Sequence, residues 1–553
     1  MQFTFTYIPV INKIQTLKIS SIIALLFLIN NAKAQQGISG IHGNFQTDIQ
    51  YYNPDSAINA PAVPEKVLAN SFLNLVYSSE NFSAGIRYES FLNALQGYDQ
   101  RYKGNGFFYR YASYTKDDLE VTAGNFYDQF GYGLIFRSYQ EWGLGYDNAM
   151  DGIRVKFKPH DGVYLKGLVA KQRSFFDYGP GLVRGADGEF NINEIFTSLA
   201  EKKTKIILGG SFISKFQADN DPIYKLPENV SAYAGRLNLS RGNFNLGGEF
   251  AYKINDPSSV NNFIYKNGQA LFLTAAYTQK GFGATLAVKR IDNMNFRSDR
   301  TAIITNLSLN FLPATTKSQT YLLANIYPYA TQPNGEMGGQ AEVFYNFRPE
   351  SKLGGKYGTN ISLNYSRVNS IDTVALDDER GYESDFLKLG DETFFQEINV
   401  EINKKFSKDF KLILTYINQI YNIDVVQGLV GHGTVYDHIG IAEINYKFNA
   451  KHSMRIELQH LYAEQDAKNW AVVLAEYNIA PHWFVAAFDE YNYGNDDKDL
   501  RIHYFSGSLG YTKGVTRIAA GYGKQRQGLL CVGGVCRQVP ASNGYTLSIT
   551  SSF

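Results

Sequence analysis

After Ala34 the chain contains no apolar run long enough to cross a bilayer as a helix, which needs about 20 such residues. This absence excludes a helical membrane protein. It does not exclude a β-barrel, because in a spanning strand only alternate residues need be apolar. Hydrophobic residues still make up 44% of the chain, so apolar surface is present without helical runs to carry it.

The chain also has almost no net charge and very little cysteine. The chain has 53 Lys and Arg against 52 Asp and Glu, a formal net charge of +1, so no nucleic-acid partner is implied. Its two cysteines, Cys531 and Cys536, stand in one Gly-rich stretch. In an exported protein this pair predicts a small loop disulfide. A metal pair is the alternative, but the flanking residues supply no third and fourth ligand.

The N-terminus has the pattern of an export signal. Lys13 and Lys18 precede an apolar run at 19–29 that is too short to span a membrane. Small residues that fit the cleavage rule follow at Ala32 and Ala34. We therefore expect a cleaved signal peptide over 1–34 and one outer-membrane domain over 35–553.

The C-terminus reads as a membrane strand. Apolar side chains alternate with small or hydroxylated ones, and the chain ends on an aromatic residue. The residues on the apolar side are Tyr545, Leu547, Ile549 and Phe553. Such an end resembles the C-terminal signal that the insertion machinery of outer-membrane barrels reads. Because every backbone polar group in a bilayer must be paired, one such strand implies a closed barrel.

The remaining chain alternates very short turns with longer polar loops. This asymmetry is typical of outer-membrane barrels, whose periplasmic turns are short and whose extracellular loops are longer. Aromatic residues make up 15% of the chain, which suits interfacial girdles. The pattern predicts an all-β, single-domain antiparallel barrel of about 26 strands, closed by pairing of the last strand with 41–52 and 515–525. The weakest assignments are a strand over 189–200 and the pair of strands that flank Pro313 and Pro328, with a turn at 313–318, so 24 is the alternative.

The stretch 124–159, which includes the long loop 127–150, is the most chemically mixed part of the chain. Its polar candidates for a constriction are Gln129, Arg137, Glu141, Asp147 and Asp151. If the loop folds inward, Arg137 facing Glu141 or Asp147 would set a transverse field that selects solutes. If it folds outward, the same charges are merely solvated.

Alternation also assigns side chains to the lumen. In the strand at 394–406 the polar face carries Glu397 and Glu401, and a later strand adds Arg455 and Glu457. We expect a mixed-charge, water-filled wall.

No catalytic or metal constellation stands out. His432, Asp437 and His438 share one stretch, but loop His and Asp residues are common. His452 and Ser453 are adjacent and so point to opposite faces of a strand. We expect neither enzymatic activity nor a cofactor.

Four stretches carry a resemblance to a family of Bacteroidota outer-membrane barrels labelled only as a domain of unknown function. They are 87–89, 124–127, 147–152 and 531–544. The resemblance implies a barrel and a location but no activity. The leading hypothesis is a porin-like or substrate-selective channel for small solutes, in contact with outer-membrane lipids and with the insertion machinery. The alternative is a non-enzymatic subunit of an outer-membrane secretion or assembly complex.

Overall fold

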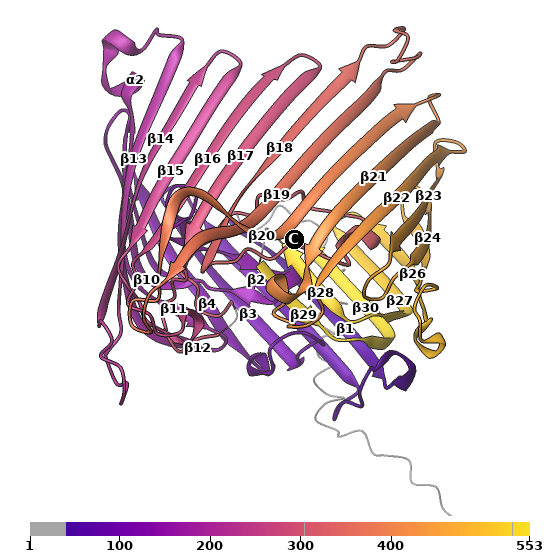
Figure 1. Cartoon of the computed structure of the whole chain (residues 1–553), viewed down its shortest axis with the longest axis horizontal. Coiled ribbons are helices and arrows are strands. Elements are labelled where there is room, and N and C mark those ends of the chain that lie inside the picture. The colour runs from indigo at the N-terminus through magenta and orange to yellow at the C-terminus, as the bar shows by residue number, and fades with distance from the viewer. Residues whose placement is uncertain (1–39, 304, 533–534) are drawn as a thin grey trace, which may run out of the picture.

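The computed structural model describes residues 40–303, 305–532 and 535–553. The expected signal peptide and its cleavage site lie outside these residues. The chain forms one closed antiparallel barrel of 24 strands (Figure 1). The alternative count of 24 strands is therefore confirmed, and the count of 26 is wrong.

The first half of the ring consists of β1 (Ile41–Asn53), β2 (Val67–Ser78), β3 (Phe82–Asn93), β4 (Gly104–Lys116), β5 (Leu119–Phe126), β10 (Met150–His160), β11 (Val163–Ser174), β12 (Asp177–Asn191), β13 (Thr204–Phe216), β14 (Asn229–Arg241), β15 (Phe244–Lys253) and β16 (Gly268–Gln279). The second half consists of β17 (Phe282–Asp292), β18 (Gly335–Phe347), β19 (Thr359–Ala375), β20 (Tyr382–Lys405), β21 (Phe410–Asn422), β22 (Thr434–Lys447), β23 (His452–Ala463), β24 (Trp470–Ile479), β25 (Trp483–Tyr491), β26 (His503–Lys513), β27 (Thr516–Gln525) and β30 (Ser542–Ser552).

Shorter elements lie outside the ring. The strands among them are β6 (Asp128–Gln129), β7 (Arg137–Ser138), β8 (Gln140–Glu141), β9 (Tyr146–Asp147), β28 (Gly528–Val532) and β29 (Val535–Val539). The helical turns are α2 (Ile192–Ile195), α3 (Ile423–Val426), η1 (Ser56–Ile58), η2 (Gln100–Tyr102), η3 (Trp142–Leu144), η4 (Thr197–Leu199), η5 (Ser259–Asn261), η6 (Leu323–Asn325) and η7 (Lys498–Leu500).

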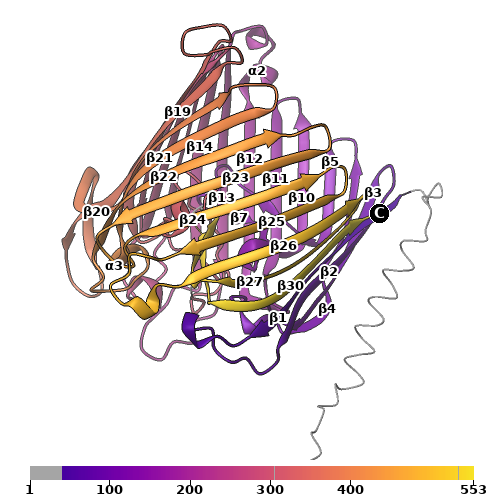
Figure 2. The ribbon, with the colours of Figure 1, turned by 90° about the vertical axis from the view of Figure 1, so that its right-hand side faces the viewer.

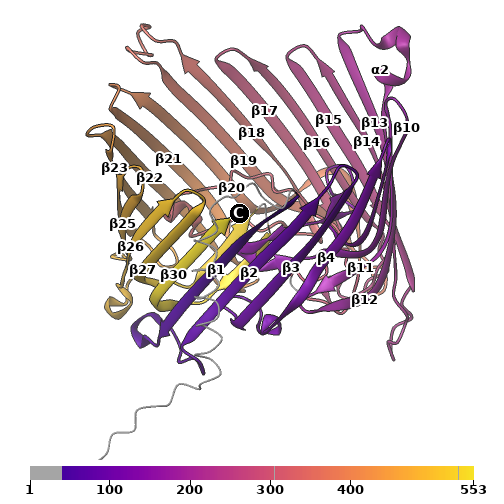
Figure 3. The same ribbon diagram turned by 180° about the vertical axis from the view of Figure 1, so that it is seen from behind.

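The last strand closes the barrel. β30 pairs with β1, where Leu547 lies opposite Ile49, and with β27, where Ile549 lies opposite Ile518. Phe553 adds two backbone hydrogen bonds to Gly43, of 2.9 and 3.0 Å. Figure 3 shows β27, β30, β1 and β2 side by side at this seam. The predicted closing pairs are confirmed.

The two ends of the barrel differ. At one end, which we call the turn end, neighbouring strands are joined mainly by short turns such as 117–118, 242–243 and 280–281. The longer connections gather at the other end, the loop end, and the strands between cross the wall at a tilt (Figure 2). Side chains alternate across the wall: in β17, Leu286 is 48% exposed on the outside whereas Ile291 is fully buried inside. An apolar outer face and a polar or packed inner face fit a membrane barrel.

Two predicted segments are not as expected. Of residues 293–303 and 305–334, none lies in a barrel strand. This stretch includes Pro313, Pro328 and Pro333, and proline cannot donate to a strand ladder. The strand expected at 189–200 ends at Asn191, because the Asn191 side chain accepts a hydrogen bond from the backbone of Asn193 and so caps α2. That strand runs from Asp177 to Asn191, so it begins 12 residues earlier than expected.

Candidate functional site: an inner layer within the lumen

The loop between β5 and β10 folds into the barrel. We call residues 127–149 the first inner segment. Phe130, Ile135 and Phe136 are fully buried. The backbone N–H of Tyr132 donates to the Glu249 carboxylate on β15 at 2.8 Å. These contacts with inward-facing side chains place the segment against the inner wall.

A buried ionic network anchors the second half of this segment. Asp147 accepts hydrogen bonds from Arg87 at 2.5 Å, from Arg173 at 2.9 Å and from the Tyr127 hydroxyl at 3.0 Å. Arg173 also pairs with Glu89 at 2.6 Å, and all four charged side chains are at most 4% exposed. Burial raises the pKa of the Tyr127 hydroxyl well above its ordinary value, so it stays a donor. Two guanidiniums balance two carboxylates, and each partner depends on the others.

The predicted charge pairing of Arg137 is wrong. Its guanidinium lies over the rings of Tyr139 and Phe311, at 4.4 and 4.1 Å from their centroids. Asp147 is already held by Arg87 and Arg173, which come from the barrel wall. Arg87 and Glu89 are two residues apart in a strand, so their side chains lie on the same face. This spacing in the sequence indicated a charged pair on the wall, but the prediction considered only the charges within the loop.

The other candidates of this loop make separate contacts. Glu141 accepts a hydrogen bond from the backbone of Gly143 at 3.0 Å, and the Gln129 amide donates to the backbone of Gly131 at 2.7 Å. Asp151, on β10, pairs with Arg110 at 2.6 Å. The five residues therefore do not converge on a single constriction.

A second loop also enters the lumen. We call residues 293–334, apart from the undescribed residue 304, the second inner segment. Its Ser308 carbonyl accepts a hydrogen bond from Gln172 on β11 at 2.7 Å, and its Leu323 N–H donates to Gln459 on β23 at 2.9 Å. Between these contacts Lys289 on β17 holds the Pro313 carbonyl at 2.7 Å. β11 and β23 are the seventh and nineteenth strands of the ring, so this segment follows half of the inner wall.

Apolar packing fixes both segments in place. Phe130 and Phe136 of the first segment and Phe296 and Leu309 of the second share one core with the wall residue Ile291. A separate core joins the second segment to β20–β24. Its fully or nearly buried members include Leu323, Tyr327, Tyr421, Ile439 and Leu461. Together the two segments form an inner layer that narrows the loop end of the lumen.

An acidic cluster lies on the wall next to this layer, toward the turn end. We call Glu443, Arg455, Glu457 and Glu476 the acidic wall. Glu443 and Glu457 are directly opposite each other in register, an unfavourable arrangement for like charges. Arg455 relieves it, with contacts to Glu443 at 3.2 Å, to Glu476 at 2.8 Å and to Glu457. One guanidinium among three carboxylates leaves the cluster net negative.

The second inner segment meets the acidic wall at one residue. The Tyr321 hydroxyl donates to Glu443 at 3.5 Å. Burial, together with Glu443, Glu401 and Glu457, raises the pKa of Tyr321 to about 12. The predicted lumen residues Glu401, Arg455 and Glu457 thus lie in one region around Tyr321. Glu397 lies closer to the loop end, where its carboxylate accepts hydrogen bonds from the Gln319 amide of the inner layer at 3.0 Å.

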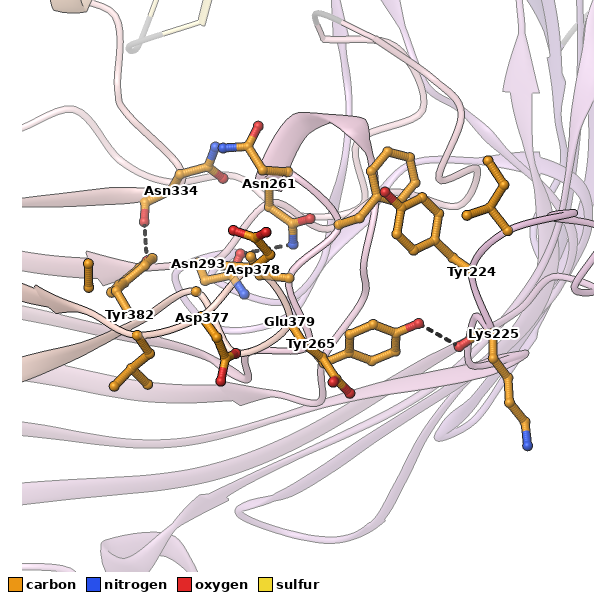
Figure 4. Close-up of a pocket in the computed structure, with 17 residues that line it drawn as sticks. Tyr224, Lys225, Asn261, Tyr265, Asn293, Asn334, Asp377, Asp378, Glu379 and Tyr382 are labelled. Atoms are coloured by element: carbon orange, nitrogen blue, oxygen red, sulfur yellow. Dashed lines mark hydrogen bonds between the residues drawn. The ribbon is translucent and has the colours of Figure 1, made fainter.

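A pocket of about 910 Å³ opens at the loop end, between the β13–β14, β15–β16 and β19–β20 connections (Figure 4). The rings of Tyr224 and Phe263 stack at 4.2 Å, and the Tyr265 hydroxyl donates to the Lys225 carbonyl at 3.0 Å. Carboxylates line it from 377 to 379. Its volume falls in the range of small-molecule sites.

The residues first weighed as metal ligands point apart. His438 is on the outer face of β22, where it contacts the Tyr416 hydroxyl at 2.7 Å, whereas Asp437 is buried on the inner face. In the described part of the chain no group of three or more His, Cys, Asp and Glu residues is placed to hold a metal ion. No helix in the same residues is long and apolar enough to span a membrane.

The two cysteines are bonded. The Cys531 and Cys536 sulfurs form a disulfide that joins β28 to β29. The next residue, Arg537, donates to the Gly143 carbonyl of the first inner segment at 2.8 Å. This hairpin therefore adds a further contact to the inner layer.

Comparison with known proteins assigns the chain to a family. A family described as a family of unknown function, DUF6029, matches residues 15–553. The chain belongs to this family. No curated protein matches it in sequence.

Several solved structures match the chain over most of its length at low identity. The siderophore receptor PirA from Pseudomonas aeruginosa is 10% identical, with 94% of this chain and 81% of that chain covered and a TM-score of 0.40. The P pilus usher (PapC) translocation pore is 9% identical, with 93% and 99% covered and a TM-score of 0.43. The copper transporter OprC is 8% identical, with 93% and 80% covered and a TM-score of 0.39. The assignment of the fold as a barrel depends on the strand pairing of this chain, which is closed by β1 and β30.

Proposed function

We propose that the protein is a non-enzymatic outer-membrane channel that passes small solutes and favours cationic ones. Barrels of 16 to 18 strands already leave an aqueous channel, and 22-stranded ones hold a plug. A ring of 24 strands has room for both a partial inner layer and a path beside it. In this proposal the turn end faces the periplasm and the loop end faces outward.

The acidic wall is the observation that carries the cation preference. Its carboxylates are partly open to the lumen: the side chain of Glu476 is 37% exposed and that of Arg455 is 28% exposed. Rings and clusters of carboxylates favour cations in pores. Passing solutes would therefore meet a net negative surface after the inner layer.

Planar bilayers with a salt gradient test this proposal. The wild-type barrel is expected to give a reversal potential of cation-selective sign. Exchanging Glu443, Glu457 and Glu476 for glutamine leaves Arg455 as the charged group of the cluster, so the potential should move toward anion selectivity. Glu141→Gln, in the first inner segment, is the matched control and should leave the reversal potential unchanged.

The inner layer is tested separately. In the first inner segment β6 pairs with β7, so residues 130–136 can be replaced by an Asn-Gly turn that keeps this pairing and keeps Asp147. The conductance should rise. A barrel that is electrically closed both before and after this change is not an open channel.

The alternative role, a subunit of a secretion or assembly complex, has one observation in its favour. Large apolar side chains are exposed at the loop end: Val430 is 91% exposed, Ile223 82% and Leu387 79%. Such residues suit contact with another protein. Co-purification of a stoichiometric partner from native membranes, lost on exchange of these three residues for serine, would favour this role over the channel.

Insertion into the membrane is also part of the proposal. We expect the insertion machinery to read β30, with Tyr545, Leu547, Ile549 and the terminal Phe553. Trimming Phe553 should slow assembly without changing the conductance of the barrels that form. A phosphonate probe for reactive hydroxyls should label nothing, and labelling of a defined residue would contradict the non-enzymatic role.

A further inference from the structure

The pocket at the loop end is built from three connections of the barrel. Its volume of about 910 Å³ lies between the β13–β14, β15–β16 and β19–β20 connections (Figure 4). The Tyr265 N–H, in the second of these, donates to the Glu379 carbonyl in the third at 2.8 Å. This hydrogen bond holds the acidic residues of one connection beside the aromatic residues of another. The pocket is therefore large enough for a small organic molecule and has a lining of mixed chemistry.

Aromatic side chains make up part of this lining. The rings of Tyr224 and Phe263 come from different connections and stack in parallel, with an angle of 3° and centroids 4.2 Å apart. Tyr265 and Tyr382 add two more rings. The face of an aromatic ring attracts a cation, because the ring quadrupole places negative charge on the face. The aromatic lining therefore suits a ligand that has a positive charge and an apolar group.

The charged side chains of the pocket are mainly acidic. The Asp377 carboxylate pairs with the Arg380 guanidinium at 2.7 Å. The carboxylates of Asp378 and Glu379 form no ion pair and no hydrogen bond with any other described residue. Lys225 is also in the lining, but Figure 4 shows its side chain pointing away from these carboxylates. Even with Lys225 and Arg380 counted, the three carboxylates leave the pocket with one net negative charge.

The buried polar side chains of the pocket already bind protein partners. The Asn261 amide donates to the Asn293 side chain at 3.1 Å, and the Asn293 amide donates to the Lys266 carbonyl at 2.6 Å. The Tyr265 hydroxyl donates to the Lys225 carbonyl at 3.0 Å. These donors hold the connections together and are not free for a neutral polar ligand such as a sugar. Ionised carboxylates only accept hydrogen bonds, so the lining favours a ligand that brings donors or a positive charge.

We propose that this pocket binds organic cations that carry an apolar group. The carboxylates of Asp378 and Glu379 attract the positive charge. The rings of Tyr224, Phe263 and Tyr265 contact the apolar group and add cation–π attraction. The site names the class of solute that a cation-favouring channel collects at its outer end. It rests on the proposed function for the passage of that solute but not for its binding.

Isothermal titration calorimetry on the full barrel in detergent tests the site without any measurement of current. Benzyltrimethylammonium is the probe, because it joins a fixed positive charge to an apolar ring. It should bind saturably, whereas phenylmethanesulfonate, an anion of similar size, and maltose should not bind. A double variant, Asp378→Asn with Glu379→Gln, should weaken binding of the probe by about tenfold. Glu383→Gln changes an exposed carboxylate of β20 outside the pocket lining and is the matched control.

A further variant tests the aromatic part of the site. Phe263→Leu keeps an apolar side chain and removes the ring, so it should weaken binding by about two- to fivefold. Heat-modifiable gel migration reports whether each barrel has closed.

Three results would overturn the proposal. They are closed wild-type barrels that do not bind the probe, a double variant that binds it as tightly as Glu383→Gln does, and wild-type barrels that bind the sulfonate or maltose as well as the cation. Binding of the probe by a barrel that passes no current would support the pocket and count against the channel, so the two proposals fail separately.

Discussion

Exchanging Asp147 for alanine removes one of the two carboxylates that balance Arg87 and Arg173. The two guanidiniums then share Glu89 alone in a region where all these side chains are at most 4% exposed. Breaking a buried ion pair by removing one partner costs about 3 to 5 kcal/mol. Since 1.4 kcal/mol is a factor of ten, the attached part of the first inner segment should open roughly a hundred to several thousand times more often.

This loss does not release the whole segment. Phe130, Leu134, Ile135 and Phe136 are each at most 1% exposed, and burial of each such side chain is worth about 1.5 to 3 kcal/mol. Their sum, about 6 to 12 kcal/mol, exceeds the loss at Asp147. We therefore expect residues 137–149 to loosen while residues 129–136 stay packed.

Hydrogen exchange of the purified barrel measures both parts in one experiment. In the Asp147→Ala variant, peptides from 137–149 should exchange faster by the factor given above, and peptides from 129–136 should keep their protection. Glu141→Gln is the control, because the Glu141 side chain accepts the Gly143 N–H and glutamine can accept the same hydrogen bond. Equal loss of protection in both parts, or none in 137–149, would refute the reasoning.

Two further predictions concern the hairpin and the outer face. Exchange of both cysteines for serine should leave the barrel closed and destabilise the β28–β29 hairpin by about 2 kcal/mol at most, because the bond closes a very short loop. Mass analysis of the loop peptide with and without reductant checks the bond, and two free thiols in protein from native membranes would contradict it. Leu286→Arg, on the outer face of β17, should lower the free energy of unfolding in lipid vesicles by about 2 to 4 kcal/mol. Its neighbour Thr285→Arg faces the lumen and should cost much less, so equal costs would mean that the assigned faces are wrong.

The path of the second inner segment could not be read from the sequence. Its residues 317–323 are compatible with alternating strands, and a turn at 313–318 looked like the other short turns. What keeps it off the wall is pairing: β17 and β18 bind each other directly, so no edge is left for two more strands. Residues such as Gln319 and Leu323 instead pair with side chains from β20 and β23 that lie far away in the sequence.

For the charged residues, too, the face of the strand could be predicted from the sequence, whereas the contact partner could not. Alternation predicted one shared face for Glu397 and Glu401 and one for Arg455 and Glu457, because strand period alone decides which face a side chain takes. Which inner residues meet depends on the register of neighbouring strands and on the loops above them. Asp147 pairs with Arg87 and Arg173, and not with Arg137, because the register and the folded loop bring those two side chains to it.

The closed barrel, the strand that closes it and the end at which the turns lie could all be predicted from local pattern. That pattern consists of period-two alternation, turn residues and the need to pair every backbone group in a membrane. The filling of the barrel, by contrast, depends on contacts between distant segments. Two loops turned inward because their apolar side chains bury against the wall and against each other, and contacts between segments so far apart in the chain leave no local pattern to read.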